Sequence, residues 1–379
     1  MTSSLDRRQA RRAFTLGLSC AVLALAACQS RAPVRPLPGE VAGPIAGARH
    51  EVALIVPLTG EDGPIGTSIS NAAKLALMDT GNQTIDLNIY DSTQGGAAAV
   101  AQKAIAEGNR LILGPLLAED VQAAGLVARQ ARVPVIAFSN DESVAGNGVY
   151  ILGFTPRQSI GRVTSYAMAR GAKRFGALVP TGVYGQRATQ AMMASLQGSS
   201  GTLGAAETFN RSAASVRTAA NALNAKGRFD AVLIADSSRI AASAATAIKA
   251  GPRLLGTELW SNDRAIGASA RMRGSWYAAV PDARFDQLVT RYRARYGKIP
   301  YRLGSLGYDA VLLTVRAARG WPAGRSFPQR VLTEKEGFAG VDGIFRFGRE
   351  GVAERSLEVR EVTAAGTKVV SPAATAFTD

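Results

Sequence analysis

The sequence predicts an α/β protein made of two doubly wound lobes, each built on a parallel sheet, with a cleft between the lobes. From residue 49 onward, short apolar runs alternate with helical stretches, and a second series of the same kind starts near Ala172. A strand that is buried on both faces has a continuous run of apolar residues. The alternation of such strands with helices along the chain is typical of parallel sheets. The chain has 379 residues, which is enough for two sizeable cores.

The first series opens with the apolar run 52–56, which predicts a buried strand. A glycine-bearing turn over 57–66 leads into a helix that carries small and apolar residues, from Ala72 to Leu77, on one face. We expect the other strands of this series near 85–90, 110–113 and 134–138, and helices near 97–107 and 119–131.

The second series predicts strands near 175–179, 202–208, 231–235 and 254–255, and helices near 185–197, 213–225 and 238–249. The last part of the chain breaks this alternation. It predicts two long helices, 285–296 and 304–319, and then two alternating strands, 344–347 and 357–362, which we expect to be antiparallel additions to the sheets.

The N-terminal segment predicts an export signal. Four arginines, the last of them Arg12, precede an uncharged run over 13–27, which is shorter than the about 20 residues that span a bilayer. The run ends in Leu25-Ala26-Ala27-Cys28, which resembles a bacterial lipobox. Residues 1–27 would then be removed as a signal peptide, and Cys28 would carry the lipid. The alternative is an ordinary signal peptide that ends at a cysteine by chance.

Two further features of this segment bear on export and sorting. Residues 11–16 resemble a twin-arginine export motif. Gln29, rather than an aspartate, follows the cysteine, which by resemblance to other lipoproteins favours the outer membrane. The stretch 28–48 begins with the lipidated cysteine and is rich in Pro, Gly and Ala, so we expect a linker that holds a periplasmic body off the membrane.

Composition argues against an enzyme. His50 is the single histidine, and the two cysteines, Cys20 and Cys28, both belong to the N-terminal segment, so histidine-based catalysis and cysteine-rich metal sites have few residues to use. No phosphate-binding loop, nucleophile elbow or H-E-x-x-H motif occurs. We expect no catalysis, no metal and no cofactor.

The chain is basic, with 44 Lys and Arg against 29 Asp and Glu. Without residues 1–27 it keeps 40 basic and 28 acidic residues, a net charge of +12. An exported protein is not expected to meet nucleic acid, so anionic lipid surfaces, cell-wall or lipopolysaccharide phosphates and acidic protein faces are the candidate partners of this charge. The densest basic segment, 284–302, also carries apolar residues at helical spacing, so its arginines form either a solvated face or a contact patch.

The ends of the predicted strands define the candidate cleft. In parallel α/β sheets, ligands bind at the carboxyl ends of the strands, and with two lobes that place is the cleft. Each of these residues also suits a helix N-cap or a turn without any ligand. The candidates taken from strand ends are Thr59, Gly60, Leu117, Ala118, Ser139, Asn140, Tyr184, Asp236, Ser237, Trp260 and Asn262.

Five stretches resemble type 1 periplasmic binding proteins of the leucine/isoleucine/valine-binding kind. They are 52–77, 111–141, 150–185, 296–315 and 337–351, and they follow one another in the order of that family. The resemblance implies two lobes joined by three crossings of the chain. The first lobe would comprise 49–152 and 281–338, and the second 153–280 and 339–375.

The resemblance also implies roles for particular residues. Amino-acid binders of this family hold the ligand carboxylate with hydroxyls and backbone amides in the loop after a Gly-Pro turn. Here that loop continues as Leu117-Ala118-Glu119-Asp120, so alanine stands where a serine is expected and two acids follow. Tyr184 matches the aromatic lid position, and Glu258 matches the acid that pairs with a ligand ammonium group.

Two motifs are similar to one branch, the lipoprotein activators of penicillin-binding proteins. They are GPLLAEDV, residues 114–121, and VPVIAFSND, residues 133–141. This resemblance implies a non-enzymatic lipoprotein, anchored by its lipid to the outer membrane, that regulates peptidoglycan synthesis by contacting a penicillin-binding protein. The alternative is the substrate-binding lipoprotein of an ABC transporter, with an ABC permease as partner and an amino acid or similar small solute as ligand.

Overall fold

The computed structural model describes residues 49–261, 263 and 265–378. The predicted signal peptide, the predicted lipidation site Cys28, the predicted linker and the candidate Asn262 therefore lie outside the described residues. Among the helices of the described ranges, none has the length and apolar character needed to cross a membrane.

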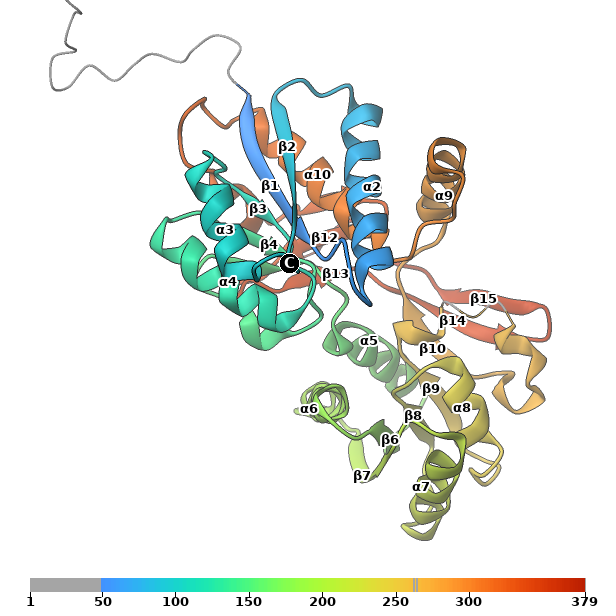
Figure 1. The fold of residues 1–379 in the computed structure, drawn as a ribbon. Helices are drawn as coiled ribbons and strands as arrows, with labels where there is room; N and C mark the ends of the chain where they lie inside the picture. Colours follow the sequence, from blue (N-terminus) through green and yellow to red (C-terminus); the bar gives the residue numbers. More distant parts are fainter. Residues whose placement is uncertain (1–48, 262, 264, 379) are drawn as a thin grey trace, which may run out of the picture. The chain divides into compact units, whose positions relative to one another are not determined.

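The first lobe is built on a five-stranded sheet in which every pairing is parallel (Figure 1). Its strands are, in spatial order, β2 (Ile85–Asp91), β1 (His50–Val56), β3 (Ile112–Leu113), β4 (Val135–Ala137) and β5 (Val149–Ile151). The helices of this lobe are α2 (Gly63–Thr80), α3 (Ala97–Ala106), α4 (Ala118–Gln130), α9 (Ala283–Tyr296) and α10 (Gly304–Ala318).

Strand β1 shows why this sheet is covered by helices on both faces. Val52, Leu54 and Val56 pack into the core shared with α2 and α10, whereas Ala53 and Ile55 pack against α3 and α4. Successive side chains of a strand point to opposite faces, so a continuous apolar run buries both. The two pairs of helices lie on opposite sides of the sheet in Figure 1.

The second lobe is built on a seven-stranded sheet. Its strands are, in spatial order, β15 (Gly366–Ser371), β14 (Glu358–Thr363), β10 (Trp276–Ala279), β9 (Arg253–Gly256), β8 (Ala231–Ile234), β6 (Arg174–Pro180) and β7 (Thr202–Phe209). Its helices are α5 (Pro156–Ala169), α6 (Val183–Leu196), α7 (Ala213–Ala225) and α8 (Ser238–Ala245). Strands β6 to β10 are parallel, and β14 and β15 are antiparallel additions, so the antiparallel strand predicted near 357–362 is confirmed.

The parallel parts of the two sheets have the same strand order. The second strand of each lobe lies outside the first, and the third, fourth and fifth follow on the other side. This doubly wound arrangement reverses direction between the first and third strands, which creates a switch point at their carboxyl ends. The predicted fold class, two doubly wound parallel-sheet lobes, is confirmed.

Both lobes also use the same close approach between a strand end and the next helix. A Cβ atom on Gly66 of α2 would lie 1.7 Å from the carbonyl oxygen of Pro57, and one on Gly185 of α6 would lie 1.7 Å from that of Pro180. Only glycine fits at these two places. The glycine-bearing loop near Gly66 therefore serves the packing of helix on strand.

A third, three-stranded sheet consists of β11 (Phe338–Gly340), β12 (Gly343–Phe347) and β13 (Ala353–Arg355), and it is antiparallel as predicted for 344–347. The resemblance predicts that 339–375 belongs to the second lobe. However, Val341, Phe345, Phe347 and Ala353 pack in the core of the first lobe. We propose that the last second-lobe segment begins after residue 355.

The chain passes between the cores of the two lobes at three places. The first lies between Leu152 and Ile160, the second after Val280, and the third between Ala353 and Leu357. Short 3₁₀ helices occupy several connections: η1 (Glu142–Val144), η2 (Glu258–Trp260), η3 (Ile266–Ala268), η4 (Ala270–Met272) and η5 (Gln329–Thr333).

Candidate functional site

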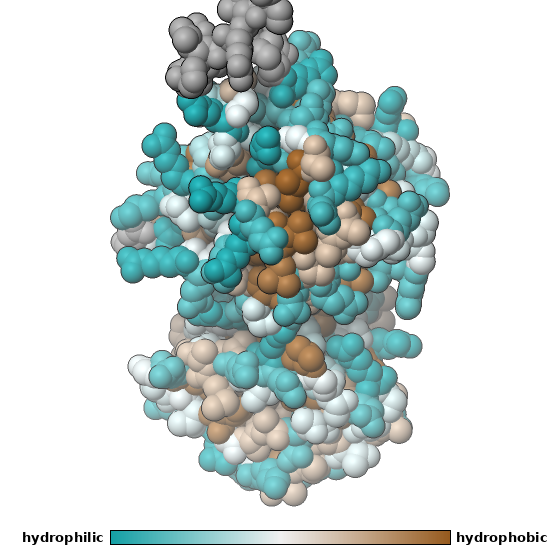
Figure 2. All heavy atoms as spheres, turned by 60° about the vertical axis from the view of Figure 1, so that its left-hand side comes forward, coloured by the Kyte–Doolittle hydropathy of each residue, from teal (hydrophilic) through white to brown (hydrophobic). Residues whose placement is uncertain are grey.

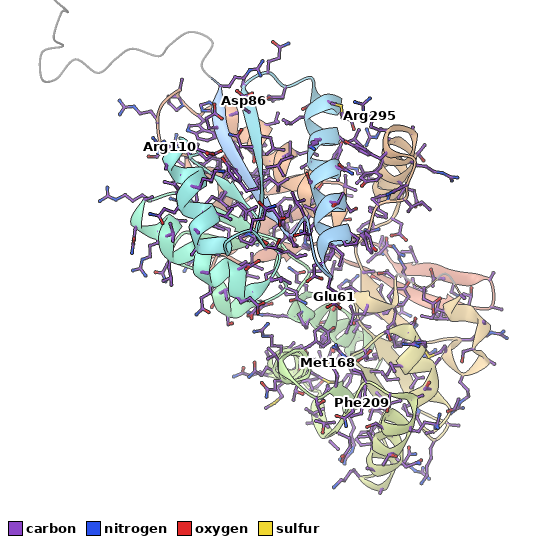
Figure 3. The ribbon with its side chains drawn as sticks, in the orientation of Figure 1. Glu61, Asp86, Arg110, Met168, Phe209 and Arg295 are labelled. Atoms are coloured by element: carbon purple, nitrogen blue, oxygen red, sulfur yellow. The ribbon has the colours of Figure 1, made fainter. Side chains whose placement is uncertain are left out.

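A cavity of about 350 Å³ lies between residues of the two lobes. The first lobe contributes the start of α2 and the segments that follow β3 and β4, and the second contributes the segment that follows β9. In Figure 3, Glu61 lies at the end of the first sheet that borders the cavity, where the strands end. Asp86 and Arg110 lie at the opposite end, where the strands begin. The cavity therefore lies at the carboxyl ends of parallel strands, where doubly wound sheets bind ligands.

The walls of the cavity are mainly apolar. The first lobe supplies side chains that include Ile65, Leu117 and Phe138, and the second supplies Leu259. Phe154, at the first crossing, packs against the cores of both lobes and also faces the cavity. Such a lining suits an apolar group better than a charged one.

Glu258 brings an acidic group to this apolar site. Part of the residue stays exposed at the cavity, but protein atoms surround its carboxyl group. Burial raises the pKa of Glu258 to about 7, and the hydroxyl of Ser159, which donates a hydrogen bond to Oε2, opposes that rise. The carboxyl group therefore changes its charge near neutral pH.

Tyr184, the predicted aromatic lid, lies near Glu258 but does not line the cavity. Its hydroxyl is 3.4 Å from Oγ1 of Thr257, and the guanidinium of Arg211 lies 5.8 Å from its ring centroid. Burial first, and then the charge of Glu258, raises the pKa of Tyr184 well above its ordinary value. The phenol is held neutral and can donate a hydrogen bond.

The loop expected to receive a ligand carboxylate is apolar at the cavity. Leu116 and Leu117 line the cavity, and helix α4 begins at Ala118 with no side-chain cap on its first turn. Glu119 and Asp120 occupy that first turn, where the helix dipole favours acids. Burial raises the pKa of Asp120.

The other candidates of the first lobe have varied surroundings. Thr59 is exposed, and its hydroxyl donates to Asp91 at 3.1 Å. Gly60 turns the chain with a φ of 74°. Ser139 is buried and accepts a hydrogen bond from the backbone N–H of Asp141 at 3.1 Å, whereas its neighbour Asn140 is exposed and lines the cavity.

Of the second-lobe candidates that the structure describes, Glu258 lines the cavity and the others lie away from it. Asp236 accepts a hydrogen bond from Arg211 at 3.0 Å, and Ser237 is the residue at the start of α8. Trp260 is fully buried, and its indole N–H donates to the carbonyl of Asp236 at 2.9 Å. Of the eleven candidates that the structure describes, Leu117, Asn140 and Glu258 share the cavity. The assignment of ligand contacts stays a prediction.

Residues near the second crossing also contribute to the cavity, although the sequence did not predict this. Val280, Arg302 and Leu303 line the cavity, and all three flank the second crossing or the start of α10. The guanidinium of Arg302 donates to Asp282 at 2.8 Å and to Asp342 at 2.7 Å, which neutralises much of its charge. Sequence signals for these residues are weak, because Arg302 and Leu303 follow no strand of the parallel sheets and Val280 follows β10, a strand that the sequence did not predict.

Metal binding finds no support in the described ranges, where no group of three His, Cys, Asp or Glu side chains could hold an ion. His50 is buried at the start of β1 and stacks on Trp321 with ring centroids 4.0 Å apart. Burial lowers the pKa of His50. It is a residue of the core.

Two doubly wound lobes with a cavity at their strand ends define a bilobal binding-protein architecture. The chain belongs to the periplasmic binding protein family, whose sequence profile matches residues 50–367. The family and its relatives are binding or regulatory proteins of the periplasm and cell envelope.

The chain is similar to proteins with two different roles. Over 149 residues it is 25% identical to the penicillin-binding protein activator LpoA of Vibrio antiquarius (strain Ex25), an alignment that covers 38% of this chain and 25% of that protein. A structure assigned to a branched-chain amino acid ABC transporter from Rhodospirillum rubrum matches with a TM-score of 0.73 at 20% identity, covering 85% of this chain and 100% of that one.

Full-length LpoA from Haemophilus influenzae matches with a TM-score of 0.67 at 19% identity, covering 86% of this chain and 59% of that one. The alignments with the curated relatives span at most 38% of the length of those proteins. The likeness to the two solved structures establishes the fold, and both roles are compatible with it.

Proposed function

We propose that this protein is a non-enzymatic lipoprotein of the cell envelope that regulates peptidoglycan synthesis by contacting a penicillin-binding protein. The observation that carries the proposal is the apolar β3–α4 loop, in which Leu116 and Leu117 line the cavity just before α4 begins at Ala118. An amino acid placed there would lose the water around its carboxylate and find no side-chain hydroxyl or cation of that loop in exchange. The sequence similarity to LpoA points in the same direction.

The surface of the first lobe supports a protein contact. Figure 2 shows hydrophobic side chains gathered in a band on the part of the molecule that contains this lobe, between hydrophilic ones. Leu126, on α4, is 63% exposed. Exposed apolar patches with polar surroundings are typical of protein interaction sites.

The location follows from the same proposal. Cys28 would carry the lipid, Gln29 would direct the protein to the outer membrane, and the linker up to residue 48 would hold the lobes in the periplasm. Labelling with a radioactive fatty acid, followed by separation of inner and outer membranes, tests this. Loss of label in Cys28→Ala with retained export supports the anchor, and label in that variant refutes it.

The functional test measures binding of the full chain to a purified penicillin-binding protein of the same organism, together with the rate of glycan-strand synthesis. We expect binding and a faster rate. Leu126→Lys should weaken both, whereas Met193→Lys, at an apolar position on α6 of the other lobe that is 57% exposed, should not. Absence of binding to every penicillin-binding protein in native membranes would refute the proposal.

The cavity favours a second candidate function, solute binding for an ABC permease. Its volume suits a small ligand, and Glu258 offers a carboxylate above neutral pH and a carboxyl donor below it. A ligand that binds only the folded state raises the unfolding temperature with its concentration. Thermal unfolding with amino acids, short peptides and muropeptides at pH 6 and 8 therefore separates the two functions. A higher unfolding temperature with one ligand class supports transport, and an unchanged unfolding temperature with all ligands supports the regulator.

A further inference from the structure

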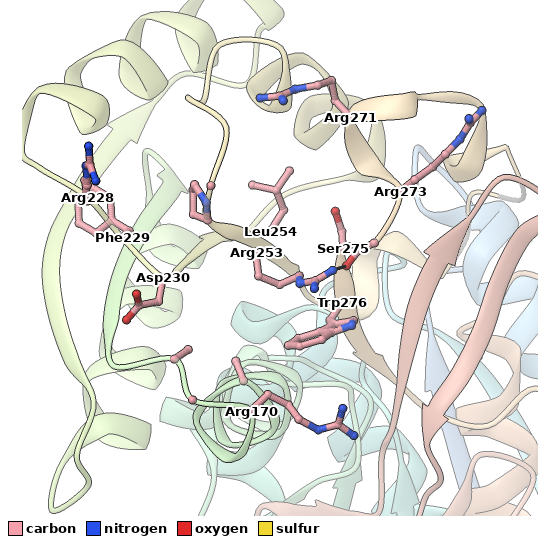
Figure 4. Close-up of a pocket in the computed structure, with 16 residues that line it drawn as sticks. Arg170, Arg228, Phe229, Asp230, Arg253, Leu254, Arg271, Arg273, Ser275 and Trp276 are labelled. Atoms are coloured by element: carbon pink, nitrogen blue, oxygen red, sulfur yellow. Dashed lines mark hydrogen bonds between the residues drawn. The ribbon is translucent and has the colours of Figure 1, made fainter.

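A second concave site lies at the opposite end of the second lobe. It has a volume of about 630 Å³, and its lining comes from the segments that precede four parallel strands, β6, β8, β9 and β10. The cleft lies at the carboxyl ends of strands, so this site, which we name the arginine basin, is separate from it. Figure 4 shows the basin.

The arginine basin is strongly basic. Among the described residues, five arginines line it, and Asp230 is the single acid. Among the residues that the structure describes, none of these five arginines forms an ion pair with a carboxylate. The arginines of the basin are Arg170, Arg228, Arg253, Arg271 and Arg273.

Asp230, the acid of the described lining, is hydrogen-bonded to the backbone. Oδ2 of Asp230 accepts hydrogen bonds from the N–H groups of Lys173 and Arg174, each at 2.8 Å. These bonds hold the turn between α5 and β6 and lower the pKa of Asp230. Outside the lining, Glu361 accepts a hydrogen bond from the indole of Trp276 at 3.0 Å and pairs with Lys368 at 2.9 Å. Lys368 first, and Arg253 more weakly, lower the pKa of Glu361. These two carboxylates therefore offset only part of the charge of the five arginines.

Backbone carbonyls and aromatic rings position most of the guanidinium groups. Arg271 donates to the carbonyls of Ala245 and Ile248, and Arg273 donates to that of Gly267 at 3.0 Å. Arg253 lies over the Trp276 ring, 4.4 Å from its centroid, and Arg170 lies over Tyr166 at 4.6 Å. Neutral partners of this kind hold an arginine in place without cancelling its charge, and they leave several of its five donors unused.

The arrangement of the guanidinium groups indicates the size of the ligand. In Figure 4, Arg228 lies on one side of the opening and Arg271 at its upper edge, Arg253 and Trp276 lie beneath Arg271, and Arg170 projects from the helix at the bottom. The positive charges are thus spread around the basin and do not converge on one point. A ligand with two or more anionic groups can contact several arginines at once, whereas a single small anion cannot.

We propose that the arginine basin binds a molecule that carries two or more phosphate groups. Arginine forks match phosphate oxygens in pairs of parallel hydrogen bonds, which makes arginine a preferred phosphate ligand. One exposed arginine in salt solution contributes little, but four net positive charges around a concave surface act together. The phosphates could belong to a membrane lipid or to a soluble polyanion, and the experiment separates these sources.

The test uses the full chain and the double variant Arg170→Gln/Arg228→Gln. Arg228 makes no contact with a polar group of the described residues, and both side chains are exposed, so the fold should survive; circular dichroism checks this. The matched control is Arg129→Gln/Arg217→Gln, which removes the same charge from exposed positions on α4 and α7.

Calorimetry with sodium tripolyphosphate, against sodium sulfate at equal ionic strength, measures the soluble arm. Co-sedimentation with phosphatidylglycerol vesicles, against phosphatidylcholine vesicles, measures the lipid arm, with the N-terminal segment identical in all variants. We expect the double variant to bind about tenfold more weakly than the control variant in at least one arm, because two charge-assisted contacts are lost. Equal binding by the two variants in both arms, or no binding by the unaltered chain, would overturn the proposal.

Discussion

The guanidinium of Arg187, on helix α6 of the second lobe, forms an ion pair with the carboxylate of Asp141, which follows β4 of the first lobe. The same carboxylate accepts hydrogen bonds from the backbone N–H and the hydroxyl of Ser143. Burial alone would raise the pKa of Asp141, but these partners outweigh it and lower the pKa. A charged contact therefore joins the two lobes directly.

Replacing Arg187 by glutamine removes this contact. Both side chains are largely buried, so we expect the free energy of unfolding at pH 7 to fall by about 1–2 kcal/mol. A carboxylate with a lowered pKa stabilises the fold above its unfolded pKa, and this contribution is lost in acid, so the difference from the unaltered chain should shrink below about pH 4. Urea unfolding measures both effects. Arg157→Gln, whose two ion pairs are longer and more exposed, is the control and should change stability less.

The second prediction concerns the buried carboxyl group at the cavity. The pKa of Glu258 rises from 4.5 to about 7 on folding, so the folded state loses stability as the pH increases between these values. Glu258→Gln should raise the unfolding temperature at pH 8, where the effect amounts to a few kcal/mol, and should have little effect near pH 4.5. The exposed Glu336→Gln serves as the control. The prediction fails if the two variants show the same pH dependence.

The third prediction tests the helix–strand approach that both lobes share. Gly66→Ala would press a methyl group into the carbonyl of Pro57, and we expect a loss of about 1–3 kcal/mol or more. Gly161→Ala, inside α5 with no atom within 4 Å of the added methyl, should instead stabilise by about 0.5–1 kcal/mol. Thermal unfolding of the two variants compares them. Similar effects of both alanines would contradict this packing.

The fourth prediction concerns the contact of α10 with α2. The hydroxyl of the buried Tyr308 donates to Asp79 at 2.8 Å, and Arg291 also pairs with Asp79 at 3.2 Å. Tyr308→Phe should cost about 1–2 kcal/mol of stability, because a hydrogen bond to a charged group is lost while Arg291 keeps the carboxylate paired. Tyr150→Phe, which loses a bond of 3.2 Å to the neutral Gln329, should cost less. Chemical denaturation distinguishes them.

Local patterns in the sequence predicted most of the parallel sheets, because strands buried on both faces leave apolar runs such as 52–56 and 231–234. Helix α5 was not among the predicted elements, although its capping box of Thr155 and Gln158 is visible in the sequence. Strands β10 and β15 were also missed. They are a short strand and an exposed edge strand, and neither has a strong alternation of its own.

The candidate site was harder to predict, because it depends on contacts between distant segments. Trp260 follows a strand, as a ligand-binding residue would, but it folds back onto Gly256, where a Cβ atom would lie 2.2 Å from the indole. The order of the last strands shows the same limit. Residues 343–347 alternate as a strand should, yet their sequence does not reveal that they pack with the first lobe.

The three crossings of the chain decide how the protein can be taken apart. A fragment that stops after β10 contains the parallel strands of both sheets, but it lacks α10, which covers the first sheet, and β14, which pairs with β10. A cut in the connection between β13 and β14 would preserve the first core and remove two strands from the second. No single cut separates one whole lobe from the other. Isolated lobes would have to be assembled from two or more pieces, and a protease that nicks one exposed loop would leave the two lobes still joined by the remaining crossings.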